Sequence, residues 1–263
     1  MTPIQSILLG ILQGLTEFLP VSSSGHLAIA QSLIPGFSQP GVLFDVLLHL
    51  GTMGAVLLYF RREIGALLCA PFRSGPEDRL QRRLLLLLIA GSVPTAIIGL
   101  AFKDFFEGLF ENLPVIALML LVTGTLLFFC ERFRRGSRRE GELTISDALI
   151  VGTVQGFSII PGISRSGSTI ATLLLRGVDG ETAARFSFLL AMPAVFGATL
   201  LSLKDLEGAA AGTLPLYLSG TAAAFAAGLL SIHFLLAVIR KKRLFAFAIY
   251  CWLAGAAVLF WTL

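Results

Sequence analysis

Six long apolar stretches constrain the fold of this chain more than any other feature of its sequence. A helix needs about 20 mostly apolar residues to cross the hydrocarbon core of a bilayer, and these stretches provide that length. Four of the six contain no Asp, Glu, Lys or Arg at all. The sequence therefore predicts six transmembrane helices, at residues 42–60, 84–102, 113–130, 186–203, within 208–239, and 244–263.

The composition excludes a soluble globular domain. Only 14% of the 263 residues are charged and 56% are hydrophobic, whereas soluble domains carry about 25% charged residues. Because this chain has too little polar surface to cover a shell exposed to water, lipid must cover it instead. We expect a single all-α integral membrane domain over residues 1–263.

The basic residues predict the orientation of the chain. They gather in three connections, at residues 61–83, 132–139 and 240–243, whereas the other connections between spans carry only Lys103 and Lys204. Connections rich in Lys and Arg stay on the cytoplasmic side, so the start of the first span and the C-terminus are expected outside. Since the basic blocks match this topology so well, we expect contact with lipid headgroups and no nucleic-acid partner.

Two further apolar segments, 4–34 and 144–176, are each interrupted in the middle by Pro, Gly and Ser. The interruptions fall at residues 20–26 and 161–167. Non-helical backbone at membrane depth is tolerated only where protein buries it or where it lines a water-filled cavity. We therefore predict that both segments are re-entrant helical hairpins.

The two interrupted segments also match each other in sequence. Gln13 corresponds to Gln155, and the serine run after each shares the same offset of 142 residues (155 − 13). The starts of the first and fourth spans share it too, so each repeat holds one hairpin and three spans. Because each repeat crosses the membrane an odd number of times, the second copy is expected to lie in the opposite orientation to the first. The pattern predicts an inverted-topology repeat, about 1–130 and 144–263, with the two hairpin tips meeting near the midplane.

The first interrupted segment carries polar groups that are unusual in an apolar stretch. Gln13 and Glu17 are four residues apart, so they share one face of the predicted helix. An ionisable side chain inside a membrane segment is costly and is by default a functional hypothesis. The alternative is that Glu17 caps the helix at an aqueous boundary. The candidate site residues here are Gln13, Glu17, Ser22, Ser23, Ser24, Gly25 and His26.

The second interruption has the composition of an anion site. Small and hydroxyl residues precede a helix, whose free N–H groups and dipole favour a bound anion. Arg165 adds a planar cation suited to phosphate oxygens. Glu17 is its expected partner in the resting state, and the alternative is a purely structural ion pair. The candidate site residues here are Ser164, Arg165, Ser166, Gly167 and Thr169.

Together the two tips offer a cation, hydroxyl groups, a carboxylate and an imidazole. Phosphoryl transfer needs charge neutralisation, positioning and a proton donor, so this set of groups suits it. A divalent cation could bridge Glu17 and the phosphates, with Mg²⁺ favoured for its oxygen preference and Ca²⁺ as the alternative. On physical grounds alone an anion transporter fits nearly as well. Asp45 and His49 are four residues apart in the first span. Asp45 could touch the site, but we interpret it as lying at the outer headgroup boundary.

Both motifs resemble the signatures of a known family. Residues 13–26, QGLTEFLPVSSSGH, and residues 161–169, PGISRSGST, look like those of the undecaprenyl-diphosphate phosphatases, the BacA bacitracin-resistance family. The resemblance covers essentially the whole chain. It implies hydrolysis of undecaprenyl diphosphate to the monophosphate with a divalent metal, which recycles the lipid carrier for peptidoglycan synthesis and cell-wall biogenesis and confers bacitracin resistance. It also implies a bacterial inner-membrane protein whose site opens toward the periplasm.

The resemblance assigns roles to individual residues. The family's Glu-or-Gln and Glu pair falls on Gln13 and Glu17, and since an amide brings no negative charge, Glu17 is the expected metal ligand. We predict that Arg165 holds the diphosphate and that Ser23 attacks the terminal phosphorus, with His26 or Glu17 as its base. A water activated by Glu17 or by the metal is the competing nucleophile. The expected substrate-binding residues are Gln13, Ser22, Ser24, Gly25, Ser164, Ser166, Gly167 and Thr169.

A second class of function stays open at this point. An inverted repeat with crossing hairpins is typical of alternating access, which makes a polyprenyl-phosphate flippase or transporter the alternative function. The expected partners are a polyprenyl diphosphate lipid and the surrounding membrane lipids. A homodimer is compatible with the sequence.

Overall fold

The computed structural model describes residues 1–37, 43–133, 136–202, 214–241 and 243–262. Parts of four predicted spans, at residues 42, 203, 208–213 and 263, lie outside the described residues. Lys204 and positions 134, 135 and 242 of the basic connections lie outside them as well.

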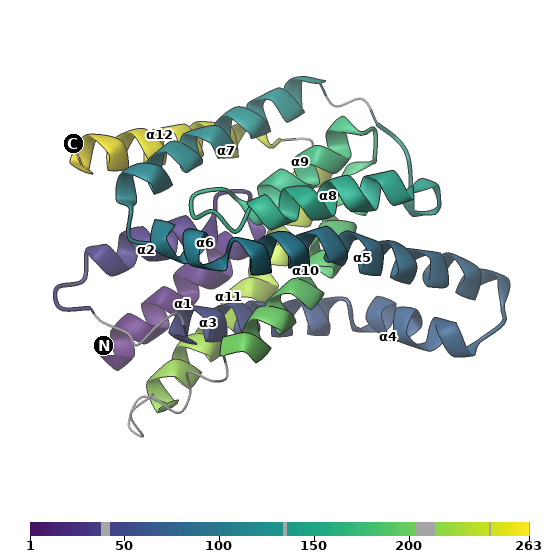
Figure 1. Ribbon diagram of the computed structural model, residues 1–263, viewed down its shortest axis with the longest axis horizontal. Helices are drawn as coiled ribbons and strands as arrows, with labels where there is room; N and C mark the ends of the chain where they lie inside the picture. Colours follow the sequence, from purple (N-terminus) through teal and green to yellow (C-terminus); the bar gives the residue numbers. More distant parts are fainter. Residues whose placement is uncertain (38–42, 134–135, 203–213, 242, 263) are drawn as a thin grey trace.

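Helices account for nearly all of the described chain, which confirms the all-α prediction (Figure 1). Two single-turn 3-10 helices, Ala70–Phe72 and Glu140–Glu142, interrupt the connections. In chain order the α-helices are α1 (Pro3–Phe18), α2 (Ser23–Ser32), α3 (Leu43–Tyr59), α4 (Arg61–Cys69), α5 (Pro76–Ala101), α6 (Lys103–Leu109), α7 (Leu113–Phe133), α8 (Ile145–Phe157), α9 (Arg165–Leu175), α10 (Gly180–Ser202), α11 (Leu214–Arg240) and α12 (Phe245–Thr262).

The membrane spans correspond to the long apolar helices. Among the described residues, five helices are long and apolar enough to cross a membrane, namely α5, α7, α10, α11 and α12. The predicted first span corresponds to α3, which has only 17 residues. It counts as a sixth span when joined to the segment Arg61–Phe72, from which it is bent by 79°. The chain is thus a multi-span membrane protein.

The two interrupted segments form two helix pairs, α1 with α2 and α8 with α9. Helix α1 has 16 residues and α8 has 13, so at 1.5 Å per residue both end before they could cross a core of about 30 Å. Figure 1 shows α1 entering from the end of the bundle that holds both termini, and α8 entering from the opposite end. The repeat boundaries and the inverted relation of the two halves stay predictions.

Glycines allow the re-entrant helices to pack closely against long spans. Helix α1 packs along α11, and α8 packs along α5. A Cβ atom on Gly10 would overlap the carbonyl of Gly220 in α11, and one on Gly152 would overlap that of Gly91 in α5. Small residues let membrane helices approach closely where no hydrophobic effect drives their association. Each re-entrant helix is therefore held by a long helix from the other half of the chain.

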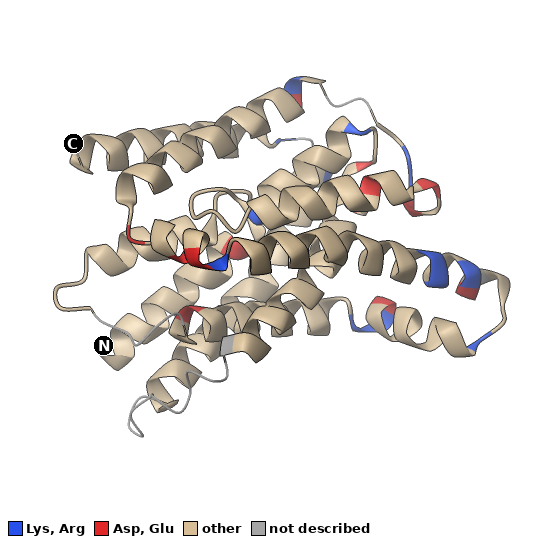
Figure 2. Cartoon of the chain, viewed as in Figure 1, with Lys and Arg blue, Asp and Glu red and all other residues tan. Residues whose placement is uncertain are grey.

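The charged side chains mark the two ends of the bundle. Figure 2 shows most Lys and Arg residues gathered at the end opposite the termini, around the connections next to α4, α5 and α8. Asp147, fully buried at the start of α8, accepts hydrogen bonds from Arg138 at 3.0 Å and from Arg176 at 2.5 Å. These ion pairs fasten the base of the second hairpin to the neighbouring connection.

Candidate active site

The two hairpin tips are in direct contact, as the sequence predicts. The backbone N–H of Gly162 donates to Oγ of Ser22 at 3.1 Å, and the hydroxyl of Ser166 donates to the carbonyl of Leu19 at 3.1 Å. Ser22 has φ 70, a left-handed conformation that a non-glycine residue rarely adopts. Such strain persists only where the surroundings impose it and often marks a functional site. Here the contact between the tips imposes it.

Helix α7 supports the second tip from behind. The hydroxyl of Thr123 donates to the carbonyl of Gly162 at 2.9 Å and accepts from the N–H of Ser164 at 3.1 Å. Ser164 then caps α9, with its Oγ accepting the N–H of Gly167 at 3.0 Å. This local bonding fixes the first turn of α9, and therefore Arg165, against the first hairpin.

Glu17 is the centre of the site. Its side chain is 4% exposed, and its Oε1 accepts from Nη2 of Arg165, whose side chain is 16% exposed. Its Oε2 accepts from the hydroxyl of Ser23 at 2.5 Å and from Nε2 of Gln13 at 2.9 Å. A carboxylate buried this deeply needs such partners, because an uncompensated charge in the interior is costly. The contacts join both sequence constellations in one cluster.

Two polar atoms of this cluster are buried without a hydrogen-bond partner among the described residues: Nη1 of Arg165 and Oε1 of Gln13. Buried polar groups are normally satisfied, so an orphaned donor or acceptor in a cluster of charges calls for an explanation. A guanidinium N–H that lacks a protein acceptor suits an anionic oxygen. Arg165 therefore has one nitrogen engaged by Glu17 and one available for a ligand.

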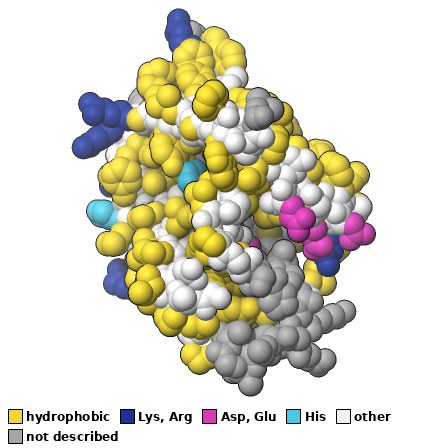
Figure 3. Space-filling view, turned by 90° about the vertical axis from the view of Figure 1, so that its left-hand side faces the viewer, with side chains coloured by type: hydrophobic (Ala, Val, Ile, Leu, Met, Phe, Trp, Pro, Cys, Tyr) yellow, Lys and Arg dark blue, Asp and Glu magenta, His cyan; other side chains and the backbone are white. Residues whose placement is uncertain are grey.

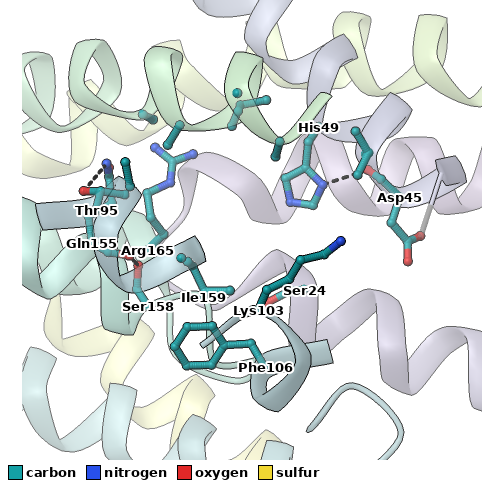
Figure 4. Close-up of a pocket in the computed structure, with 18 of the residues that line it drawn as sticks. Ser24, Asp45, His49, Thr95, Lys103, Phe106, Gln155, Ser158, Ile159 and Arg165 are labelled. Atoms are coloured by element: carbon teal, nitrogen blue, oxygen red, sulfur yellow. Dashed lines mark hydrogen bonds between the residues drawn. The ribbon is translucent and has the colours of Figure 1, made fainter. Parts of the chain in front are cut away.

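A cavity of about 520 Å³ opens from this cluster. Its walls come from both hairpins and from α3, α5, α6 and α10, and Figure 4 shows Arg165, His49 and Lys103 reaching into it from different elements. Much of the wall is apolar, with small residues on α10 such as Ala194 and Ala198. A polar cluster at one end of a largely apolar cavity suits an amphiphilic ligand with an anionic head.

His49 and Asp45 line this cavity, so Asp45 touches the site, and our interpretation that it lies at the outer headgroup boundary stays a prediction. The ring Nδ1–H of His49 donates to the backbone carbonyl of Asp45 at 2.8 Å, and its Nε2 lies 3.5 Å from Oε2 of Glu17 (Figure 4). The carboxylate of Asp45 accepts from Nε2 of Gln31 at 2.6 Å. The spacing of Asp45 and His49 in an apolar span was the signal that could have placed them at the site.

His26 lies apart from the cavity. Its Nδ1–H donates to the carbonyl of Ser22 at 2.7 Å, and its Nε2 lies 2.6 Å from the hydroxyl of Tyr250 on α12. The two rings are stacked, with centroids 5.6 Å apart. Both ring nitrogens are therefore engaged outside the cavity wall, and the structure does not bring His26 to the hydroxyl of Ser23. Ser23 faces the carboxylate of Glu17, the other candidate for its base.

Some of the remaining candidate site residues line the cavity, and the others hold the hairpin tips in place. Ser24 and Ser164 line the cavity, whereas Ser22, Gly25, Ser166, Gly167 and Thr169 hold the tips together or cap their helices. Thr169 is fully buried, with its hydroxyl 2.6 Å from that of Ser187 on α10. Gln155 and Thr95 also line the cavity and share a 3.2 Å hydrogen bond. The sequence analysis noted Gln155 only as the repeat equivalent of Gln13 and placed neither residue at the site, because their proximity arises from packing of α8 on α5.

The described residues around Glu17 fit a metal ion only if a phosphate ligand helps to hold it. The described residues contain no group of three or more His, Cys, Asp or Glu that could enclose an ion. They do offer one carboxylate and the orphaned Oε1 of Gln13. Mg²⁺ is commonly held by one or two carboxylates together with substrate phosphates. A metal bound here would accompany a phosphate ligand, and Glu17 and Gln13 are the residues that would hold it.

The fold and the site together define a class: multi-span membrane enzymes that handle a phosphate group where two broken helices meet inside the bundle. The family model described as bacitracin resistance protein BacA matches residues 6–257. The chain belongs to the BacA family.

Full-length relatives agree with this assignment. A protein named undecaprenyl-diphosphatase from Syntrophotalea carbinolica is 63% identical over 255 residues, which cover 97% of each chain. One of the same name from Desulforapulum autotrophicum is 44% identical over 263 residues, 95% of each chain. A third, from Carboxydothermus hydrogenoformans, is 43% identical over 263 residues, covering 98% of this chain and 97% of its own.

Proposed function

We propose that this protein is an undecaprenyl-diphosphatase, which hydrolyses undecaprenyl diphosphate to undecaprenyl phosphate and inorganic phosphate. The family and the relatives support this reaction. The observation that carries it is the cluster in which Glu17 contacts both Ser23 and Arg165 beside an apolar cavity. Through this reaction the protein recycles the lipid carrier for cell-wall synthesis and contributes to bacitracin resistance.

The cavity is proposed to open toward the periplasm. Its wall uses Asp45 near the start of α3, residues 92–100 in the second half of α5, and Lys103 in α6. These parts lie toward the end of the bundle opposite most of the basic residues (Figure 2), and basic connections are cytoplasmic. Figure 3 looks onto that outer end, where the surface is largely hydrophobic and charged side chains gather at its sides.

In the proposed mechanism Arg165 binds the diphosphate. Its orphaned Nη1 and the start of α9 provide donors for phosphate oxygens. The apolar part of the cavity takes the first isoprene units. This arrangement orients the terminal phosphorus toward Ser23 and Glu17, and positioning with charge neutralisation is most of what phosphoryl transfer requires.

The proposed nucleophile is Oγ of Ser23. As it bonds to the terminal phosphorus, its proton passes to Oε2 of Glu17, and the bond between that phosphorus and the bridging oxygen breaks to release undecaprenyl phosphate. After Glu17 passes this proton on, it takes a proton from the water that attacks the phosphoserine. The bond between phosphorus and Oγ of Ser23 breaks, Oγ regains a proton from Glu17, and inorganic phosphate leaves. Nε2 of His49, whose Nδ1–H donates to the carbonyl of Asp45, faces Oε2 of Glu17 and is the proposed onward proton acceptor. A water held by Glu17 is the alternative nucleophile.

A divalent cation, with Mg²⁺ first and Ca²⁺ second, is proposed to accompany the substrate. Among the described residues, the ionisable groups that line the cavity are three carboxylates (Glu17, Asp45 and Glu107), two cations (Lys103 and Arg165) and His49. Carboxylates thus outnumber the Lys and Arg side chains in the described lining, which weakens its attraction for a diphosphate. A bound dication would neutralise the phosphate oxygens and polarise the phosphorus.

The test is phosphate release from undecaprenyl diphosphate by purified protein in detergent, with Mg²⁺ or with a chelator. We expect release that falls at least tenfold on chelation, as removal of a charge-neutralising ion implies. A folded protein without release, but with transfer of the lipid between leaflets of a vesicle, would contradict the phosphatase and support the flippase alternative. Phosphate release that a chelator does not change would contradict the proposed divalent cation but not the phosphatase activity.

A further inference from the structure

Helix α6 presents one face to the cavity. The chain bends after α5 at Phe102, where φ is −116 and ψ is 20. Beyond the bend, Lys103, Phe106, Glu107 and Phe110 all line the cavity. Their spacing of three and four residues is that of a single helical face. Phe106 is buried at 3% exposure and anchors the helix there.

The cation of this face is held only loosely. Nζ of Lys103 lies 3.6 Å from Oε1 of Glu107, and the two side chains are 57% and 46% exposed. Exposed ion pairs of this kind contribute little to stability. The long side chain of Lys103 can therefore leave Glu107 when a stronger anion arrives. In the view of Figure 4 its amine points toward the wall formed by His49 and Asp45, away from Arg165.

A diphosphate needs more positive charge than the central cluster provides. Arg165 already shares its charge with Glu17. In the part of the chain that the structure describes, Lys103 is the second cation that lines the cavity. A compact ammonium on a flexible stem is a common phosphate ligand.

We infer that Lys103 forms a second anion subsite at the cavity mouth, where it exchanges Glu107 for a phosphate group of the incoming prenyl diphosphate. This inference rests on the proposed function, because it concerns the substrate of the same cavity. Glu107 acts as the resting counter-ion, so it competes with the substrate for Lys103. The two partners of one ion pair should therefore affect substrate binding in opposite directions.

Steady-state phosphate release tests this opposition. We expect Lys103→Gln to raise KM for undecaprenyl diphosphate about tenfold with kcat within about twofold, the loss of one charge-assisted hydrogen bond. Glu107→Gln frees Lys103 and should lower KM about two- to threefold. Lys103→Arg should keep KM within about threefold of the original protein. Asp104→Asn, an exposed neighbour on α6 that does not line the cavity, is the matched control and should change nothing.

A merely structural ion pair would give a different result, since both neutral variants would then raise KM alike or leave it unchanged. Either result overturns the inference. Calorimetric binding of a short prenyl methylenediphosphonate, which cannot be hydrolysed, separates the subsite from the reaction. If the original protein shows no turnover but Lys103→Gln weakens binding of this analogue, the subsite is supported and the phosphatase proposal is wrong. If the original protein shows turnover but Lys103→Gln binds the analogue as tightly as before, the phosphatase proposal is supported and the subsite is wrong.

Discussion

The pair formed by Glu17 and Arg165 can be separated into a structural and a chemical contribution by a double-mutant cycle. Arg165→Met removes the cation and leaves Glu17, 4% exposed, without its charge partner. Breaking a buried ion pair from one side costs about 3–5 kcal/mol. Glu17→Gln leaves Arg165, which is 16% exposed and better solvated, so a smaller loss of about 1–3 kcal/mol is expected. Together the two changes leave no unpaired charge.

We therefore expect the double variant to recover most of the stability that Arg165→Met loses, because replacing both partners of a buried pair is often neutral. Activity should not recover. Each single variant loses the donor or the base, and we expect roughly a thousandfold lower kcat/KM in all three proteins. Stability is measured by thermal unfolding in detergent, and activity by phosphate release. A double variant that regains substantial turnover would refute the chemical role and reduce the pair to a structural contact.

Three further predictions address other parts of the structure. Ser23→Ala should lower kcat roughly a hundredfold, and unchanged phosphate release would leave water as the nucleophile. Gly162→Ala should destabilise the fold by at least about 2 kcal/mol, because φ is +94 and the new Cβ would meet the backbone of α7; a thermal midpoint equal to the original would contradict this. Burial raises the pKa of Asp147, but hydrogen bonds from Arg138, Thr144 and Arg176 outweigh it and hold that pKa well below its usual range. Asp147 therefore stabilises the fold above about pH 4 and loses this contribution on further acidification, so the stability gap to Asp147→Asn, measured by unfolding against pH, should be constant near neutrality and shrink in acid.

The sequence predicted the fold well because membrane spans are encoded locally. Length and hydropathy of a single segment suffice to identify a spanning helix, and the breaks in the hairpins coincide with Pro, Gly and Ser. The pairing of Glu17 with Arg165 was also predictable, since a buried charge in an apolar segment requires a partner.

The orientation of side chains at the breaks was not predictable. Ser22, Ser23 and Ser24 are chemically alike, and only the left-handed turn at Ser22 decides that Ser23 faces Glu17. The same turn directs His26 to Tyr250, more than 200 residues away in sequence. No local pattern encodes such a partner.

Residues outside the motifs were missed for a related reason. His49 lies in a span and Lys103 in a connection, where polar residues are usually assigned to the water boundary. Their place in the cavity depends on how α3 and α6 pack around the two tips. From the sequence alone, the spacing of polar residues in an apolar span is the only signal for such a place, as for Asp45 and His49.

The separation of 148 residues between Glu17 and Arg165 has a consequence for biosynthesis. At translation rates of 5–20 residues per second, on the order of 10 s pass between the synthesis of the carboxylate and that of its guanidinium partner. During that interval the first hairpin cannot settle at depth with its charge compensated. Until the second hairpin is made, Glu17 is less costly in water, or neutral, than charged at membrane depth. Completion of the site is thus tied to synthesis of the second hairpin, and a product truncated before it lacks the guanidinium partner of Glu17.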